Sequence, residues 1–360
     1  MTLDALHDPR RNAVTVVRLV LALSVIVWHA VPLGGFTKSW PLADAAIGSK
    51  WGVDGFFVLS GFLVTAAWLR RPSLVVYLRH RALRLMPAYL VVLVVTAFVV
   101  APWAWARQHG GLTGVLDAPL GPLRYVLANS LLVQLQEQIA GTPAGVPYPL
   151  VWNGSLWTLV WEAGAYLAVA LLGVAGVLRA RRGWVLAGAA ALWAVVVVRA
   201  IVPSTAASWA SATTANHALR LGLMFAVGLV LCLYADRIAV DGRLALGAAA
   251  LVAAAALWGN YLVVAPAFGY LLLWVCLRLP WGRGVRTDLS YGTYVYAFVV
   301  AQVLALLGAP AHGYIVFVAL TVAGTLPLAA ASWWLVEKPA LSRKDPRGSP
   351  GRARASAAPG

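Results

Sequence analysis

Long apolar runs separated by short polar segments dominate this chain. In hydrocarbon only a helix pairs every backbone group within its own segment, and about 17 to 25 apolar residues are needed to cross the membrane core. The pattern therefore predicts an all-α fold, a polytopic transmembrane helix bundle of about ten spans. The expected spans are residues 14–33, 52–69, 85–105, 155–178, 184–202, 217–235, 244–259, 261–278, 289–308 and 312–335.

An eleventh apolar stretch, residues 121–138, differs from these spans because polar side chains interrupt it throughout. We expect it to be an amphipathic or re-entrant segment. It lies within residues 106–153, the longest stretch between expected spans, which is rich in glycine and proline and could cover a site or meet a substrate. Its polar residues are Arg124, Asn129, Gln134, Gln136, Glu137 and Gln138.

The composition agrees with a membrane protein whose main partner is the lipid bilayer. Hydrophobic residues make up 61% of the chain and charged residues 11%, whereas a soluble domain carries about a quarter charged residues. The net charge of +16 would also fit a nucleic-acid-binding protein. However, the basic residues form short clusters between apolar runs, as in cytoplasmic loops, so we expect no nucleic-acid partner.

The distribution of lysine and arginine predicts the orientation. With the N-terminus inside, the loops assigned to the cytoplasm hold 21 lysines and arginines, and the outer loops hold four. This asymmetry predicts a multi-pass membrane protein with both termini cytoplasmic. The first run follows Arg10 and Arg11, as a signal peptide would, but it is long and lacks a small-residue cleavage site, so we expect it to be retained.

One membrane domain is expected over residues 1–340, followed by a disordered basic cytoplasmic tail at 341–360, because the tail has too few apolar residues to pack. Cys232 and Cys276 lie within apolar runs without metal-like spacing. Neither a metal site nor a disulfide is therefore expected. We find no sequence signal for the oligomeric state.

Two ionisable residues in the first span are the leading candidates for chemistry. Arg18 and His29 are eleven residues apart, which places them on one helix face about 16 Å apart along the axis. His29 could act as a general base, or it could be hydrogen-bonded between helices. Arg18 could bind a phosphate, or it could anchor the helix at the cytoplasmic interface.

Asp54 begins the second span on the side where the first span ends. A pair between His29 and Asp54 is therefore expected, in which the carboxylate would fix the imidazole tautomer. The alternative is that Asp54 caps the helix N-terminus. Ser60 and Gly61 follow as small residues that permit close helix approach.

A basic cluster precedes the third expected span on the cytoplasmic side. Arg79, His80, Arg81 and Arg84 could embrace the phosphates of a nucleotide-bearing donor, or they could set the topology and meet anionic lipid.

Glu162 lies inside the fourth expected span, where a carboxylate needs a partner. Arg220, His29 or a substrate hydroxyl are the candidates. Trp152, Trp157 and Tyr166 surround it in the sequence and are candidate substrate-contacting aromatics, because an aromatic ring can stack on a sugar. Aromatic residues are also common at membrane interfaces.

The order of these clusters resembles the acyltransferase-3 family of integral membrane acyltransferases. The resemblance covers nearly the whole chain apart from the tail. The matching motifs are Arg18-x10-His29, Gly52-Val-Asp54-Gly-Phe56-Phe57-Val-Leu-Ser60-Gly61-Phe62, Arg81-x-x-Arg84-x-x-Pro87, Ser155-Leu-Trp157-Thr-Leu with Glu162 and Tyr166, Ser290-Tyr291-Gly292 and, at the end, Glu337-Lys-Pro339.

The resemblance implies transfer of an acyl group, often acetyl, from a coenzyme A thioester to a hydroxyl of a surface polysaccharide, glycolipid, peptidoglycan or macrolide. It implies that Arg18 and His29 form the essential pair, with His29 the general base, and that Arg81 and Arg84 lie near the donor. Two departures are visible: His80 replaces an arginine of the usual basic run, and Ala297 stands where many members have a histidine.

We therefore expect a membrane acyltransferase with acyl-CoA as its donor substrate, no metal, and a carbohydrate or glycolipid acceptor. His29, Arg18, Asp54 and Glu162 are the expected catalytic residues. The alternative is a secondary transporter or flippase for a glycolipid that uses the same charged spans as its path, although we find no internal repeat of the kind such folds show.

Overall fold

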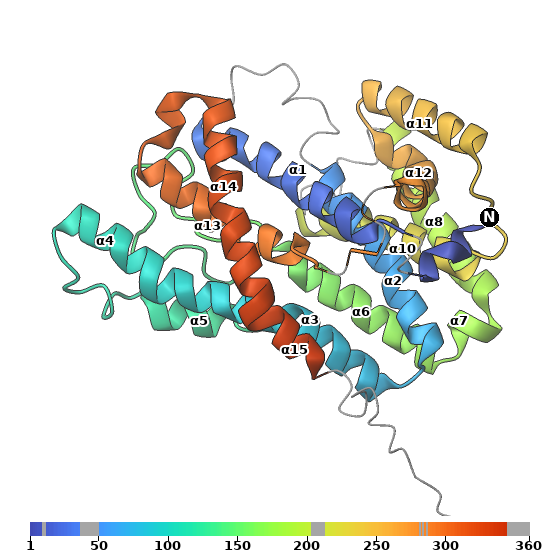
Figure 1. Ribbon diagram of the computed structural model, residues 1–360, viewed down its shortest axis with the longest axis horizontal. Helices are drawn as coiled ribbons and strands as arrows, with labels where there is room; N and C mark the ends of the chain where they lie inside the picture. Colours follow the sequence, from blue (N-terminus) through green and yellow to red (C-terminus); the bar gives the residue numbers. More distant parts are fainter. Residues whose placement is uncertain are drawn as a thin grey trace, which may run out of the picture.

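The chain folds as a bundle of helices in the computed structural model, which describes residues 1–8, 12–36, 50–202, 213–280, 282, 284–285 and 287–343 (Figure 1). Within these residues there is no β-strand, and two isolated β-bridges are the only strand-like pairings. The expected all-α fold is confirmed.

Ten helical segments account for the ten apolar runs. Two of them continue through a π-helical turn, η2 (Thr96–Val100) or η5 (Trp333–Glu337). The main helices are α1 (Val14–Gly34), α2 (Trp51–Arg70), α3 (Leu74–Val95) with α4 (Ala101–His109), α6 (Thr158–Val174), α8 (Arg182–Ile201), α10 (Thr213–Leu233), α11 (Gly242–Leu257), α12 (Ala265–Arg278), α13 (Ser290–Leu306) and α14 (Tyr314–Ser332) with α15 (Lys338–Ser342).

Seven helices in the described part of the chain are long and apolar enough to cross a membrane, and α6, α11 and α13 are shorter apolar helices. The polytopic architecture is therefore confirmed. The segment 121–138 is helical only over α5 (Pro122–Asn129), so it is no span, as expected.

The third span begins earlier than predicted. We expected it to start at residue 85, but the helix starts at Leu74 and runs unbroken to His109. Pro87 lies within it, and the helix continues through the proline. The basic cluster from Arg79 to Arg84 is therefore part of the helix and not of a preceding loop.

The described N- and C-terminal segments are each hydrogen-bonded to a helix at the end of the bundle that holds Arg18, which we call the Arg18 end. The amide of Ala13 donates to the carbonyl of Cys276 at 2.8 Å, and Arg79 donates to the carbonyl of Arg343 at 2.7 Å. The opposite end, toward which α1 carries His29, is called the His29 end. Which end faces the cytoplasm stays a prediction, and most of the expected tail, residues 344–360, lies outside the described residues.

Glycines bring α2 and α10 into close contact. A Cβ on Gly61 would overlap the carbonyl oxygen of Phe225, and one on Gly228 would overlap that of Val58. Small residues thus permit close approach here, as expected for Gly61. Ser60, in contrast, has a polar partner of its own, described below.

Candidate active site

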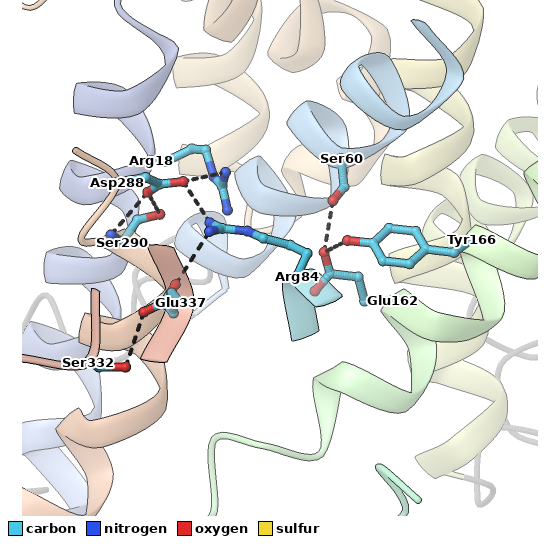
Figure 2. Close-up of polar contacts among 9 residues, drawn as sticks. All are labelled: Arg18, Ser60, Arg84, Glu162, Tyr166, Asp288, Ser290, Ser332 and Glu337. Atoms are coloured by element: carbon cyan, nitrogen blue, oxygen red, sulfur yellow. Dashed lines mark hydrogen bonds and ion pairs between the residues drawn. The ribbon is translucent and has the colours of Figure 1, made fainter. Parts of the chain in front are cut away.

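Four charged side chains form one network at the Arg18 end (Figure 2). Arg18 and Arg84 both donate to Oδ2 of Asp288, at 2.8 and 2.6 Å. Arg84 also pairs with Glu337 at 3.3 Å, and Ser332 donates to the other oxygen of Glu337 at 3.2 Å. The two guanidinium groups are thereby balanced by two carboxylates.

Asp288 owes its position to the loop before α13. Its Oδ1 accepts from the amide and the hydroxyl of Ser290, at 3.1 and 2.5 Å, which satisfies one of the free amides in the first turn of the helix. Burial alone would raise the pKa of Asp288, but Arg18 and Arg84 outweigh this effect and hold the pKa well below its usual range. The two arginines therefore favour the ionised form of Asp288.

A second polar cluster lies beside this network (Figure 2). Ser60 of α2 donates to Glu162 Oε1 at 3.0 Å, and the hydroxyl of Tyr166 donates to the same oxygen. Arg81 lies over the ring of Tyr166, with its guanidinium carbon 5.6 Å from the ring centroid. Glu162 thus finds its partners in Ser60 and Tyr166, and not in Arg220 or His29, two of its three expected candidates; the third, a substrate hydroxyl, stays a prediction.

Both clusters face a cavity of about 40 Å³, which we call the inner cavity. Its polar lining includes Arg18, Arg84, Glu162 and Ser60, and Tyr294 lines its wall. A space of this size holds only a few water molecules.

His29 occupies a defined orientation near the other end of α1. Its Nδ1 lies 2.9 Å from the carbonyl oxygen of Val25, and its ring meets the ring of Phe298 edge-on at 5.8 Å. A carbonyl only accepts hydrogen bonds, so Nδ1 carries the proton. In the neutral ring this leaves the lone pair of Nε2 available as a base.

A small middle cavity of about 10 Å³ shares lining residues with the inner cavity and with an outer cleft beside His29. Tyr294 lines both the inner and the middle cavity, and His29 lines both the middle cavity and the outer cleft of about 610 Å³. The middle cavity has room for about one water molecule. Tyr294 and His29 therefore stand between the arginine network and the outer cleft.

The expected pair of His29 and Asp54 does not form, and this prediction is wrong. Asp54 is fully buried and pairs with Arg220 at 2.8 Å, and the hydroxyl of Tyr261 donates to it. The reason is the depth at which α2 begins. Glycines flanking Asp54 pack against Ser24 and Leu21, five to eight residues before His29, which is about 8–12 Å along α1. The carbonyl of Val25 fixes the tautomer instead.

The structure brings Arg18 and Arg84 together through Asp288, but it does not leave them free for a phosphate. Arg81 is packed against the rings of Tyr77 and Tyr166. His80 is partly buried in the same first turns of α3.

The expected substrate-contacting aromatics separate into different places. Trp157 lines the outer cleft. Trp152 is fully buried and donates to Thr142 at 3.0 Å, so the expectation that it contacts substrate is wrong. Tyr166 is buried beside Glu162, away from the cleft.

Sequence reasoning gave no role to Asp288, His217 or Glu137, although all three face these sites. Two features of the sequence could have marked Asp288 as a candidate: the chain has only 12 acidic residues, and this one precedes a helix by two positions. His217 and Glu137 carried none, because their place in the outer cleft depends on packing between distant segments. The described residues contain no group of three or more His, Cys, Asp or Glu able to hold a metal ion.

Comparison with known proteins places the chain among acyltransferases. A family model described as an acyltransferase domain matches residues 11–334. The chain is 28% identical to nodulation protein 10 of Rhizobium leguminosarum bv. viciae, covering 92% of this chain and 93% of that protein. It is 25% identical to the O-acetyl transferase of Shigella phage Sf6, covering 94% and 98%. It is 27% identical to exopolysaccharide production protein ExoZ of Rhizobium meliloti, covering 84% and 90%. No solved structure matches the chain significantly.

Proposed function

The chain belongs to the acyltransferase-3 family and is a membrane O-acyltransferase, and we propose that it transfers an acetyl group from acetyl-coenzyme A to a hydroxyl of a surface carbohydrate. The relatives support the acceptor class, since one is named an O-acetyl transferase and another an exopolysaccharide production protein. This assignment takes the place of the transporter alternative.

The observation that carries the proposal is the sequence of cavities along α1. The inner cavity lies at Arg18 and Arg84, the outer cleft lies at His29, and the middle cavity shares Tyr294 with the inner cavity and His29 with the outer cleft. The long pantetheine arm of coenzyme A separates its phosphates from its thioester. With its phosphates at the Arg18 end, the donor would extend its arm along α1 and place its thioester near His29.

In the proposed reaction His29 acts on the acceptor. Its Nε2 removes the proton from the acceptor hydroxyl while that oxygen attacks the thioester carbonyl. The carbon–sulfur bond then breaks, and the coenzyme A thiolate leaves and takes the proton from His29. An alternative form has the acyl group rest on His29 or another side chain before it reaches the acceptor.

Donor binding requires a rearrangement. The inner cavity is far smaller than a pantetheine arm, and Arg18 and Arg84 are held by Asp288 and Glu337. We propose that the donor's phosphates take over hydrogen bonds of these arginines, together with Arg81, and that Tyr294 moves to admit the thioester. An arginine binds phosphate in the same forked geometry that it uses for a carboxylate, so the exchange is chemically matched.

The proposed orientation places the donor in the cytoplasm and the acceptor outside the bacterial plasma membrane. It rests on the excess of basic residues in the loops at the Arg18 end.

The test is acetyl transfer by purified protein with and without His29. We expect release of coenzyme A from acetyl-coenzyme A in the presence of membrane glycan, and loss of at least about a hundredfold in His29→Ala. His312→Ala is the matched control, since this histidine is exposed at the same end of the bundle. Wild-type rates in folded His29→Ala would overturn the mechanism, and glycan transport without coenzyme A release would overturn the function. Mass spectrometry of surface glycans with and without the protein then identifies the acceptor.

A further inference from the structure

The outer cleft contains a carboxylate that the mechanism above does not use. Glu137 lines this cleft together with His29, and its side chain is exposed. No described residue forms a hydrogen bond or an ion pair with this carboxylate. It is also the only carboxylate among the described residues that line the cleft.

The loop that carries Glu137 is held in place by buried hydrogen bonds. The side chain of Asn129, itself fully buried, accepts from the amides of Leu135 and Gln136 at 2.9 and 3.1 Å and donates to the carbonyl of Gln136 at 2.8 Å. The amide of Trp152 donates to the carbonyl of Glu137 at 3.0 Å. An unpartnered carboxylate on so constrained a backbone is pre-organised for a ligand.

Aromatic and imidazole groups complete the cleft. The rings of Trp157 and His217 lie 4.0 Å apart at an angle of 31°, and both residues line the cleft. Tyr148 lies at its wall, and its ring contacts Phe298, the residue that packs on His29. A volume of about 610 Å³ with apolar surfaces and a few converging polar groups is typical of a binding site for a small polar ligand.

We infer that this cleft is the acceptor subsite, and that Glu137 determines which sugars it accepts. The inference rests on the proposed function and adds a substrate class to it. An ionised carboxylate only accepts hydrogen bonds, so Glu137 binds hydroxyl or amino groups next to the hydroxyl that is acylated. A carboxylate or phosphate on the acceptor at that place would be repelled. The acceptor is therefore a neutral or amino sugar at the acylated residue.

The test uses the purified full-length protein at saturating acetyl-coenzyme A with three probes: methyl glucoside, methyl glucosaminide and methyl glucuronide. Product mass and coenzyme A release are both measured. We expect kcat/KM for the first two to exceed that for the glucuronide at least tenfold. In Glu137→Gln we expect KM for the glucoside to rise about five- to tenfold, because the amide keeps an acceptor oxygen but replaces a hydrogen bond to a charged group by a weaker neutral one. The value of kcat should stay unchanged, and the discrimination against the glucuronide should narrow.

Asp117→Asn is the matched control, since Asp117 is an exposed acid of the same outer segment that does not line the cleft. It should leave all three KM values unchanged. The inference is overturned if Glu137→Gln leaves KM and discrimination unchanged, if the glucuronide is the best probe, or if acetyl-coenzyme A is consumed with no probe acetylated. Absence of any coenzyme A release instead overturns the proposed function itself.

Discussion

Arg18 and Asp288 form an ion pair of 2.8 Å across 270 positions of the chain. The same carboxylate oxygen accepts from Arg84 at 2.6 Å. Two arginines that the sequence presents as separate phosphate ligands are thus one unit with a shared counter-ion. A phosphate that binds either arginine must therefore compete with Asp288 for its hydrogen bonds.

Asp288→Asn should destabilise the protein by about 2 kcal/mol, because it leaves the positive charges of Arg18 and Arg84 close together without the negative charge that neutralises them. The value allows for the partial exposure of the pair. The pKa of Asp288 is lowered in the folded protein, so its stabilisation is complete above about pH 4, the unfolded value, and is lost as the pH falls through the folded one. Thermal unfolding in detergent should show a constant difference from wild type over about pH 5 to 8 that narrows below about pH 4. A difference that widens on acidification would contradict this account.

Glu162→Gln should reduce acetyl transfer at least about tenfold while the melting temperature changes little. The amide keeps an acceptor for Ser60 and Tyr166 but removes the only negative charge lining the inner cavity among the described residues. Tyr166→Phe removes one hydrogen bond to that oxygen and keeps the charge, so it serves as the comparison. If both variants reduce stability and leave kcat unchanged, Glu162 has a structural role only.

Gly228→Ala should destabilise the bundle by about 1–3 kcal/mol, since the new methyl group would overlap the Val58 carbonyl and force α2 and α10 apart. Gly188→Ala in α8 is the control, because nothing lies within 4 Å of the added Cβ. Unfolding followed by tryptophan fluorescence measures both. Equal melting temperatures for the two variants would show that the contact is not tight in solution.

Arg220→Gln should destabilise the protein by about 3–5 kcal/mol, because it leaves the fully buried Asp54 without its partner, and Asp54→Asn should destabilise it less, because the Arg220 side chain is 12% exposed. The double variant should be less destabilised than the sum of the two single variants. The exposed pair Asp236 and Arg237, 3.9 Å apart, is the control and should show no measurable coupling. Additive effects at Asp54 and Arg220 would mean that the two residues act independently.

Much of the architecture could be predicted because membrane helices follow a local rule. Each of the ten apolar runs had to become a helix in order to pair its own backbone groups, whatever its neighbours were. Once α1 is a helix, its regular geometry places Arg18 and His29, eleven residues apart, on one face. The start of the third helix was misplaced because the turns from Arg79 to Arg84 are polar in sequence and yet continue the helix, with Arg79 exposed and Arg84 partly buried.

The partners of the site residues could not be predicted in the same way. The pairing of His29 with Asp54 assumed that α2 begins level with the end of α1. In the fold Gly52 and Gly55 let α2 start beside the middle of α1, and Asp54 meets Arg220 instead.

By itself, therefore, the sequence determined which segments are helices, the spacing of groups within one helix, and the family. Only the tertiary structure decided that Asp288 joins Arg18 to Arg84, that Val25 sets the tautomer of His29, and that Glu137 and His217 face the same cleft as His29. The physical reason is the distance along the chain over which each kind of interaction acts. Backbone pairing acts within a few residues, whereas the depth and rotation of one helix against another depend on side-chain contacts between segments hundreds of positions apart.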